Sequence, residues 1–144
     1  MAKDLSNVRA VVTGAGQGIG AAIAKGLAEA GARVVIADLN GGNAQNVADE
    51  IGERACATAV DVRDRASVAA AIGVAVEAFG GLDAMFNNAG IAQVRPFLSI
   101  TEEDFRTVID VNALGVMIGM QEAIKVMLEP VSYTHLTLPT ILRV

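Results

Sequence analysis

Three closely spaced glycines near the amino terminus form the strongest chemical motif of the sequence. Gly14, Gly18 and Gly20 lie in the stretch TGAGQGIG, between an apolar run at 9–14 and a helical pattern at 19–31. Glycine allows a sharp turn and lets the backbone approach a phosphate without a Cβ in the way, and the helix that follows presents free N–H groups. No Lys-Ser or Lys-Thr pair follows, as a mononucleotide P-loop would require. The motif therefore predicts a turn that binds a pyrophosphate.

A carboxylate at the end of the next apolar run fits the same ligand. Asp38 lies near the end of the run at 32–39, about 20 residues after the glycine turn, where dinucleotide-binding folds hold the adenosine ribose. Its charge would accept hydrogen bonds from the ribose hydroxyls and would repel a 2′-phosphate. No Arg or Lys occurs at 15–17, and Asn40 follows the acid. We therefore expect NAD as the cofactor, with NADP as the less favoured alternative.

The elements that must position these residues follow from the apolar pattern. We expect strands at 9–14, 32–39 and 55–62, a fourth strand with a turn at 82–90, and helices at 19–31, 43–52, 66–80 and 101–128. Alternation of this kind requires parallel strands joined by right-handed crossovers. The predicted fold class is α/β, a Rossmann-like doubly wound parallel sheet truncated after about four strands in the order 3-2-1-4.

The composition restricts the classes of binding partner and the cellular compartment that we expect. A net charge of −5 and a pI near 4.7 argue against nucleic acid and anionic membrane surfaces. The longest uncharged apolar run, 68–76, is too short to span a bilayer, and the first residues show no secretory signal. One Cys (Cys56) and one His allow neither an internal disulfide nor a zinc constellation. We expect a cytoplasmic protein with no metal, no nucleic-acid partner and no membrane partner.

Four motifs, in this order and spacing, resemble the classical short-chain dehydrogenase/reductase family. They are the Gly-x-x-x-Gly-x-Gly loop, DV at 61–62, NNAG at 87–90 and VNALG at 111–115. The resemblance covers about residues 5 to 129, and it implies hydride transfer between a nicotinamide and an alcohol or ketone carbon. It also implies a set of cofactor-binding residues: Gly14, Gln17, Gly18, Ile19, Gly20, Asp38, Leu39, Asp61, Val62, Asn87, Asn88, Ala89 and Gly90.

The resemblance also assigns individual roles. Asp61 would accept a hydrogen bond from the adenine amino group, and Val62 would pack against the ring. The NNAG residues would lie beside the cofactor and stabilise the central sheet. Asn112 would be the asparagine of the catalytic tetrad and would hold a water in a proton relay. Without the family, the alternative for an Asn in the middle of a helix is a tolerated polar position.

The other catalytic groups of the family do not occur in these 144 residues. The family uses a Tyr that supplies or removes a proton, a Lys four residues later that lowers the Tyr pKa, and a Ser on an earlier strand. The single Tyr is Tyr133, with Thr137 four positions later and Ser132 directly before it. We expect the chain to be inactive by itself. The alternative is a non-catalytic dinucleotide-binding module.

The last residues differ sharply from the rest of the chain. The stretch 131–144 contains no Ala, no Gly and no acidic residue. Most of it resembles the in-frame translation of a transposase sequencing-library adapter, and our hypothesis is a natural gene cut near codon 129 and read through. The alternative is a genuine edge strand ended by Pro139. On the first interpretation, 1–129 is an incomplete NAD-binding Rossmann domain and 130–144 is a non-native tail.

For the full-length parent, the resemblance implies a small-molecule alcohol or ketone substrate and a homo-oligomer. The helix at 101–128 should form part of the family's dimer helix bundle. Val116, Met120 and Met127 would then be exposed on faces of this helix that a partner covers.

Overall fold

The computed structural model describes residues 4–128. Within this range, parallel strands form one sheet in the order β3-β2-β1-β4. This confirms the predicted fold class and strand order. The predicted tail at 130–144, including Tyr133, lies outside the described residues. The strands are β1 (Arg9–Thr13), β2 (Arg33–Asp38), β3 (Ala55–Ala59) and β4 (Ala84–Phe86).

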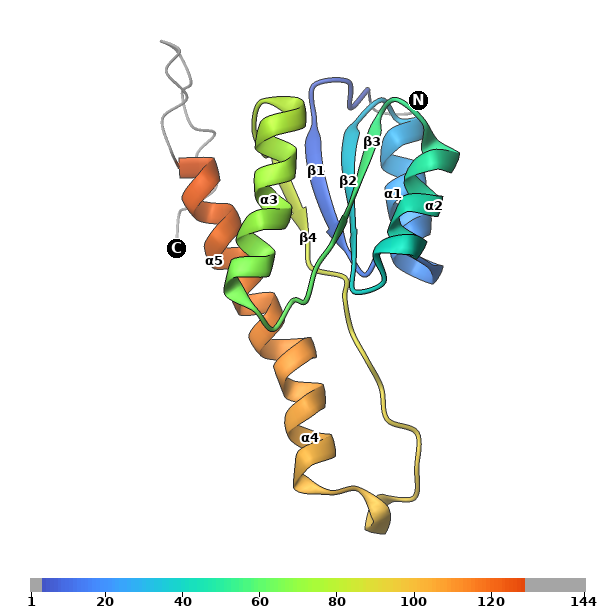
Figure 1. Ribbon diagram of the computed structural model, residues 1–144, viewed down its shortest axis with the longest axis vertical. Helices are drawn as coiled ribbons and strands as arrows, with labels where there is room; N and C mark the ends of the chain where they lie inside the picture. Colours follow the sequence, from blue (N-terminus) through green and yellow to red (C-terminus); the bar gives the residue numbers. More distant parts are fainter. Residues whose placement is uncertain (1–3, 129–144) are drawn as a thin grey trace.

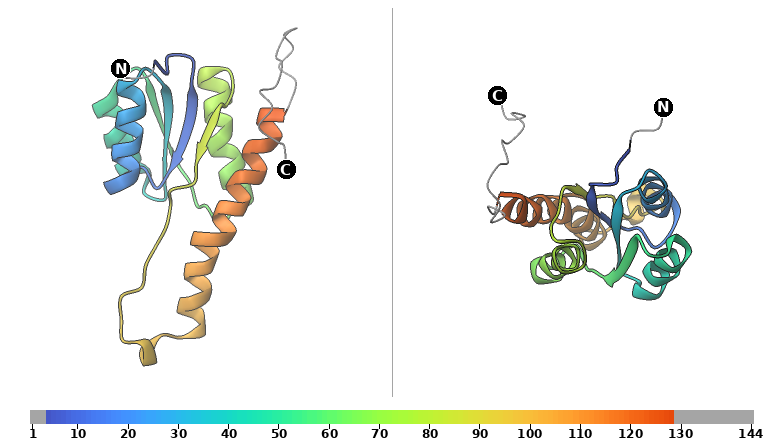
Figure 2. Two further views of the ribbon diagram at one scale, coloured as in Figure 1. Left: turned by 180° about the vertical axis from the view of Figure 1, so that it is seen from behind. Right: turned by 90° about the horizontal axis from the view of Figure 1, so that it is seen from above.

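Helices cover both faces of the sheet (Figures 1 and 2). On one face lie α1 (Gly18–Glu29) and α2 (Gly41–Ile51), and on the other lies α3 (Arg65–Phe79), with α5 (Gly115–Leu128) beside it. Parallel strands covered on both sides are expected to be apolar throughout instead of alternating. This explains the unbroken runs of β1 and β2.

Side chains of neighbouring strand positions enter opposite layers of the core. Val11 and Val35 pack with Ile72 in the layer beneath α3. Val12 and Ile36 pack in the layer beneath α1 and α2. These five side chains are 0 to 1% exposed, so the two central strands are closed on both faces by the chain's own helices.

Two strands are shorter than the sequence predicts, because tertiary contacts end them early. β3 stops at Ala59: the Val60 N–H still bonds to the Asp38 carbonyl of β2 at 2.8 Å, but the Asp61 N–H bonds to the Ser67 hydroxyl of α3 at 3.0 Å. β4 stops at Phe86, since the N–H of Asn88 is shared by the Phe86 carbonyl, two residues earlier, at 3.0 Å and the Thr13 hydroxyl at 3.1 Å, and it does not continue the strand pairing.

The predicted helix at 101–128 is a single helix with an irregular centre. It consists of α4 (Glu102–Ile109), a π-helical turn η2 (Asp110–Leu114) and α5. By length and composition this helix is apolar enough to cross a membrane, since an 18-residue window of it has a mean hydropathy of 1.3. Core helices of non-membrane proteins meet the same criterion. Met120 and Met127 are exposed on it, as predicted, whereas Val116 is half-buried.

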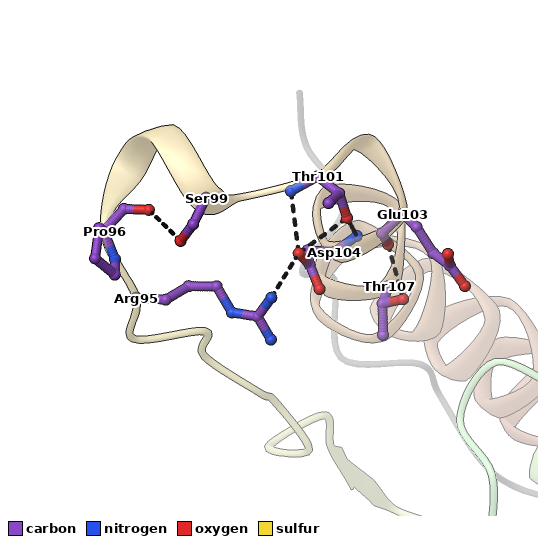
Figure 3. A network of polar contacts seen from close by, with 7 residues as sticks. All are labelled: Arg95, Pro96, Ser99, Thr101, Glu103, Asp104 and Thr107. Carbon is purple, nitrogen blue, oxygen red and sulfur yellow. Dashed lines mark hydrogen bonds and ion pairs between the residues drawn. The ribbon is translucent and has the colours of Figure 1, made fainter.

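The segment between β4 and α5 projects away from the sheet (Figure 1). It contains the short helix η1 (Phe97–Ser99), and neither η1 nor α4 buries a residue. Figure 3 shows the polar contacts at its tip: the Asp104 carboxylate accepts hydrogen bonds from the N–H and hydroxyl of Thr101 and from the Arg95 guanidinium.

Candidate functional site

A cavity of about 600 Å³ opens where the carboxyl ends of the strands meet. β1 lies between β2 and β4, so the strand order reverses there, and ligands of open α/β sheets bind at such a point. Asn87 and Asn112 lie outside the cavity lining. The other predicted site residues line it together: Gly14, Gln17, Gly18, Ile19, Gly20, Asp38, Leu39, Asp61, Val62, Asn88, Ala89 and Gly90.

The amino terminus of α1 reaches this cavity without a side-chain cap. Gln17 occupies the capping position, but its side chain makes no capping hydrogen bond, and the first turn contains no acidic residue. By contrast, Asn40, Asp64 and Thr101 cap the helices that follow them. An uncapped first turn leaves N–H donors and the positive end of the helix dipole for an anionic ligand.

Gly20 allows α1 to lie directly against the ends of β1 and β4. A Cβ on Gly20 would lie 2.2 Å from the Gly14 carbonyl oxygen and 2.5 Å from the Asn88 amide nitrogen. Real Cβ atoms do not approach other atoms this closely, so only glycine fits. The third glycine of the motif therefore sets the packing of the helix on the strands, as such motifs require.

Thr13 and Asn88 join the ends of β1 and β4 beneath the cavity. The Thr13 hydroxyl accepts hydrogen bonds from the N–H groups of Asn88 and Ala89, both at 3.1 Å, and donates to the Phe86 carbonyl at 3.3 Å. The Asn88 amide donates to the carbonyls of Thr13 and Gly14 at 3.0 and 3.2 Å. Thr13 is 1% exposed. The network thus fixes the base of the cavity across two non-consecutive strands.

Asp38 is anchored by backbone on both sides. Its Oδ2 accepts from the N–H of Gly16 and its Oδ1 from the N–H of Asn40, each at 2.9 Å. The side chain is half-buried at the end of β2. A carboxylate has about four acceptor positions, so free acceptor capacity remains on both oxygens for a ligand hydroxyl.

Asp61 is paired with Arg63, which the sequence analysis did not assign to the site. Asp61 Oδ1 accepts from the N–H and Nε of Arg63, and Oδ2 accepts from Nη2 at 2.7 Å. These hydrogen bonds from Arg63 lower the pKa of Asp61 below its ordinary value. Three of about four acceptor positions are then occupied, which leaves one for an amino group.

Asn112 lies in the π-helical turn, and its side chain binds the neighbouring loop. Its Oδ1 accepts from the Ile91 N–H at 2.9 Å, and its Nδ2 donates to the Ile91 carbonyl at 2.8 Å. The turn is closed by an N–H of Gly115 that reaches the Asp110 carbonyl, a five-residue step. π-turns of this kind are frequent at functional sites. Both polar ends of the Asn112 side chain are therefore engaged.

Asn87 packs against α5 instead of lining the cavity. A Cβ on Gly119 would lie 2.0 Å from the Asn87 Oδ1, so this glycine makes room for the side chain.

Sequence reasoning missed several lining residues: Val60, Arg63, Ile91, Thr107 and Val111. Val111 belongs to the VNALG motif itself, and neighbours in the DV and NNAG motifs were the available signal for Val60, Arg63 and Ile91. Thr107, on α4, had none.

A family model described as short chain dehydrogenase matches residues 8–132. Among curated proteins, galactitol 2-dehydrogenase of Agrobacterium fabrum is 40% identical over 124 residues, and sorbitol dehydrogenase of Cereibacter sphaeroides is 36% identical over 124 residues. Each match covers 86% of this chain and 48% of the relative. The chain therefore spans about half the length of the curated relatives it matches.

Solved structures give the same picture. A short-chain dehydrogenase/reductase of Brucella melitensis, named glucose/ribitol dehydrogenase, superposes with a TM-score of 0.83 at 30% identity, over 88% of this chain and 54% of that chain. A 3-ketoacyl-(acyl-carrier-protein) reductase of the same organism, solved with NADH, gives 0.80 at 38% identity, over 84% of this chain and 50% of that chain.

Proposed function

Because the chain belongs to the short-chain dehydrogenase family, we propose that it is the NAD-binding part of an NAD-dependent oxidoreductase. One observation carries the proposal: the uncapped start of α1 and the carboxylate of Asp38 line the same cavity. A dinucleotide needs both, because its pyrophosphate requires N–H donors and its adenosine ribose requires an acceptor.

The described residues fit this ligand along its length. The first turn of α1 binds the pyrophosphate, Asp38 binds the adenosine ribose, and Asp61 accepts from the adenine amino group with Val62 against the ring. A volume of about 600 Å³ lies within the range of small-molecule sites, roughly 300–1,000 Å³. The Asp38 carboxylate favours NAD over NADP, since a 2′-phosphate would be repelled.

The full-length parent transfers a hydride between the nicotinamide and an alcohol or ketone carbon. The bound nicotinamide supplies the hydride acceptor or donor. Asn112 positions the Ile91 backbone at the cavity wall. Its side-chain oxygen and nitrogen each make one hydrogen bond there, so each keeps capacity for a proton-relay water. The relatives named for galactitol and sorbitol support an alcohol substrate of the polyol kind.

These 144 residues contain no Tyr-x-x-x-Lys pair. A positioned acid or base contributes about 10²–10⁴ in rate, so the chain by itself binds NAD without oxidising alcohols. The second candidate function, a dinucleotide-binding module without catalysis, rests on the same observation. Only an activity measurement on the longer parent distinguishes the catalytic from the non-catalytic function.

Titration calorimetry of the 144-residue chain with NAD tests the binding proposal. We expect saturable heat, and about tenfold weaker binding for Asp38→Ala, because a hydrogen bond to a charged group is lost. A folded sample that gives no heat with NAD overturns it. Alcohol-dependent formation of NADH by the 144-residue chain would overturn the prediction that this chain is inactive. If the full-length parent also forms no NADH from alcohols, the non-catalytic module is the function that remains.

We also propose that the parent is a cytoplasmic homo-oligomer. The exposed apolar side chains of α5, Met120 and Met127 among them, support an assembled state. Sedimentation of the full-length parent is expected to give a mass of at least two chains, and a monomer at micromolar concentration would contradict this.

A further inference from the structure

Gly16 lies in contact with the carboxylate that the proposed function places at the ribose. Its N–H donates to Asp38 Oδ2 at 2.9 Å. A Cβ on Gly16 would lie 2.8 Å from Asp38 Cγ, 2.9 Å from Asp38 Oδ2 and 2.8 Å from the Cβ of Asn43. Each of these distances is shorter than real Cβ contacts allow.

Glycine is required at position 16 only because there is no room for a Cβ. Gly16 is not among the glycines with a left-handed φ, so its backbone accommodates any residue. An added Cβ would meet Asn43 on one side, where α2 begins, and the carboxylate on the other. Since α2 is capped and packed on β2 and β3, the carboxylate is the part that moves.

Such a movement would break the double anchor of Asp38. The carboxylate now receives one backbone N–H on each oxygen, from Gly16 and from Asn40. Two anchors fix both the rotamer and the orientation of the free acceptor positions before any ligand arrives. Pre-organisation of this kind reduces the cost of binding.

We propose that Gly16 is the positioning residue that sets the preference for a ribose without a 2′-phosphate. It does so through Asp38, by leaving room for the carboxylate and by donating its N–H to it. The proposal rests on the proposed function, because it assigns the specificity of the same site.

A double-mutant cycle on the 144-residue chain tests it. The four proteins are the wild type, Gly16→Ala, Asp38→Ala and the double variant, each titrated with NAD and with NADP by calorimetry. Gly73→Ala is the matched control, because a Cβ at Gly73 in α3 meets nothing within 4 Å. This control is expected to keep the wild-type ratio of NAD to NADP affinity.

We expect Gly16→Ala to weaken NAD binding about tenfold, the cost of losing a hydrogen bond to a charged group. NADP binding should change less, so the ratio of the two affinities falls. In the Asp38→Ala background the same substitution should change the ratio by less than about twofold, since no carboxylate remains to be displaced. A merely structural role would weaken both ligands equally in both backgrounds.

Two results overturn the proposal: an unchanged affinity ratio in Gly16→Ala, or a fall in the ratio of equal size with and without Asp38. If the wild type binds NAD and one of these results follows, only the role of Gly16 fails. If the folded wild type binds neither dinucleotide, the proposed function and this inference fail together.

If Gly16→Ala does not fold, amide hydrogen exchange tests the proposal without this variant. The Gly16 amide proton is expected to exchange about tenfold faster in Asp38→Ala than in the wild type, because it loses its acceptor. Equal exchange rates in the two proteins overturn the proposal.

Discussion

The chain up to Gly90 and the segment at 91–109 differ in what surrounds their apolar side chains. In the first region the strands β1 and β2 are closed on both faces by helices, and Ile72 of α3 is 1% exposed. In the second, Leu98 of η1 is 98% exposed, and α4 buries nothing. The first region is stabilised by burial of its own elements, whereas the second is maintained mainly by local polar contacts.

The polar contacts of the two regions differ in reach as well. Thr13 binds the backbone of Asn88, 75 positions away in the sequence, in a buried setting. Asp104 binds Thr101 and Arg95, three and nine positions away, in an exposed one. Long-range contacts stabilise the fold as a whole, while short-range contacts stabilise one helix start. Matched substitutions in the two regions should therefore have unequal effects.

The largest difference is expected for truncation of one apolar side chain in each region. Ile72→Ala removes a buried side chain and should lower the free energy of unfolding by about 3–4 kcal/mol. Leu98→Ala alters a side chain that contacts almost nothing and should change it by less than about 0.5 kcal/mol. Urea unfolding of the 144-residue chain measures both. A large loss from Leu98→Ala would show that the projecting segment packs on the sheet in solution.

The next difference concerns one hydroxyl in each region. Thr13→Val keeps the shape but removes the acceptor of the Ala89 N–H and one of the two acceptors of the Asn88 N–H, which should cost about 1–3 kcal/mol. Thr107→Val removes a hydroxyl that donates to the Glu103 carbonyl within its own exposed helix, and it should cost less than about 0.5 kcal/mol. Similar losses in the two variants would contradict the distinction between long-range and local contacts.

The sequence predicted most reliably the features that local geometry dictates. The glycine loop and Asp38 were found from their spacing, since the close packing at Gly20 and the position at the end of β2 leave little freedom. The alternation of apolar runs predicted parallel strands, and the dinucleotide-binding fold predicted their order. Whether these residues bind a dinucleotide stays a prediction.

The features that sequence reasoning missed depend on contacts between distant segments or on small changes of periodicity. Asn88 leaves β4 to form hydrogen bonds with Thr13, and no local sequence pattern predicts this long-range contact. Arg63 follows the DV motif, yet its pairing with Asp61 depends on a side-chain rotamer. The π-turn around Asn112 is a single five-residue step in a long helix, too short to alter the apolar spacing.

A smaller effect is expected for the ion pair that joins β1 to the loop before β4. Arg9 donates to both oxygens of Asp83, and these bonds lower the pKa of Asp83 below its ordinary value of 3.8. A lowered folded-state pKa contributes stability above the unfolded-state value, and the contribution is lost as pH falls through the folded-state value. Because the pair is partly exposed, Asp83→Asn should cost about 1 kcal/mol at neutral pH.

Unfolding of the wild type and Asp83→Asn from neutral pH to below pH 3.8 measures this contribution. The two stabilities should converge as the pH falls, since protonation removes the charge that the variant lacks. A difference that persists unchanged at the lowest pH would mean that Asp83 acts through its shape and not through its charge.

The smallest effects concern the pKa values of two carboxylates, Asp83 in the first region and Asp104 in the second. The cause of the lowered pKa differs between the two regions. The pKa of Asp83 is low chiefly because of hydrogen bonds from the Arg9 side chain, whereas that of Asp104 is low chiefly because of the Thr101 backbone N–H. Arg9→Ala should therefore return the Asp83 pKa towards 3.8, while Arg95→Ala should leave the Asp104 pKa depressed and the unfolding midpoint unchanged. Carboxyl carbon shifts followed by NMR during acid titration report each pKa directly. A return of the Asp104 pKa to its ordinary value in Arg95→Ala would show that the tip of the projecting segment depends on its ion pair rather than on the capping box of α4.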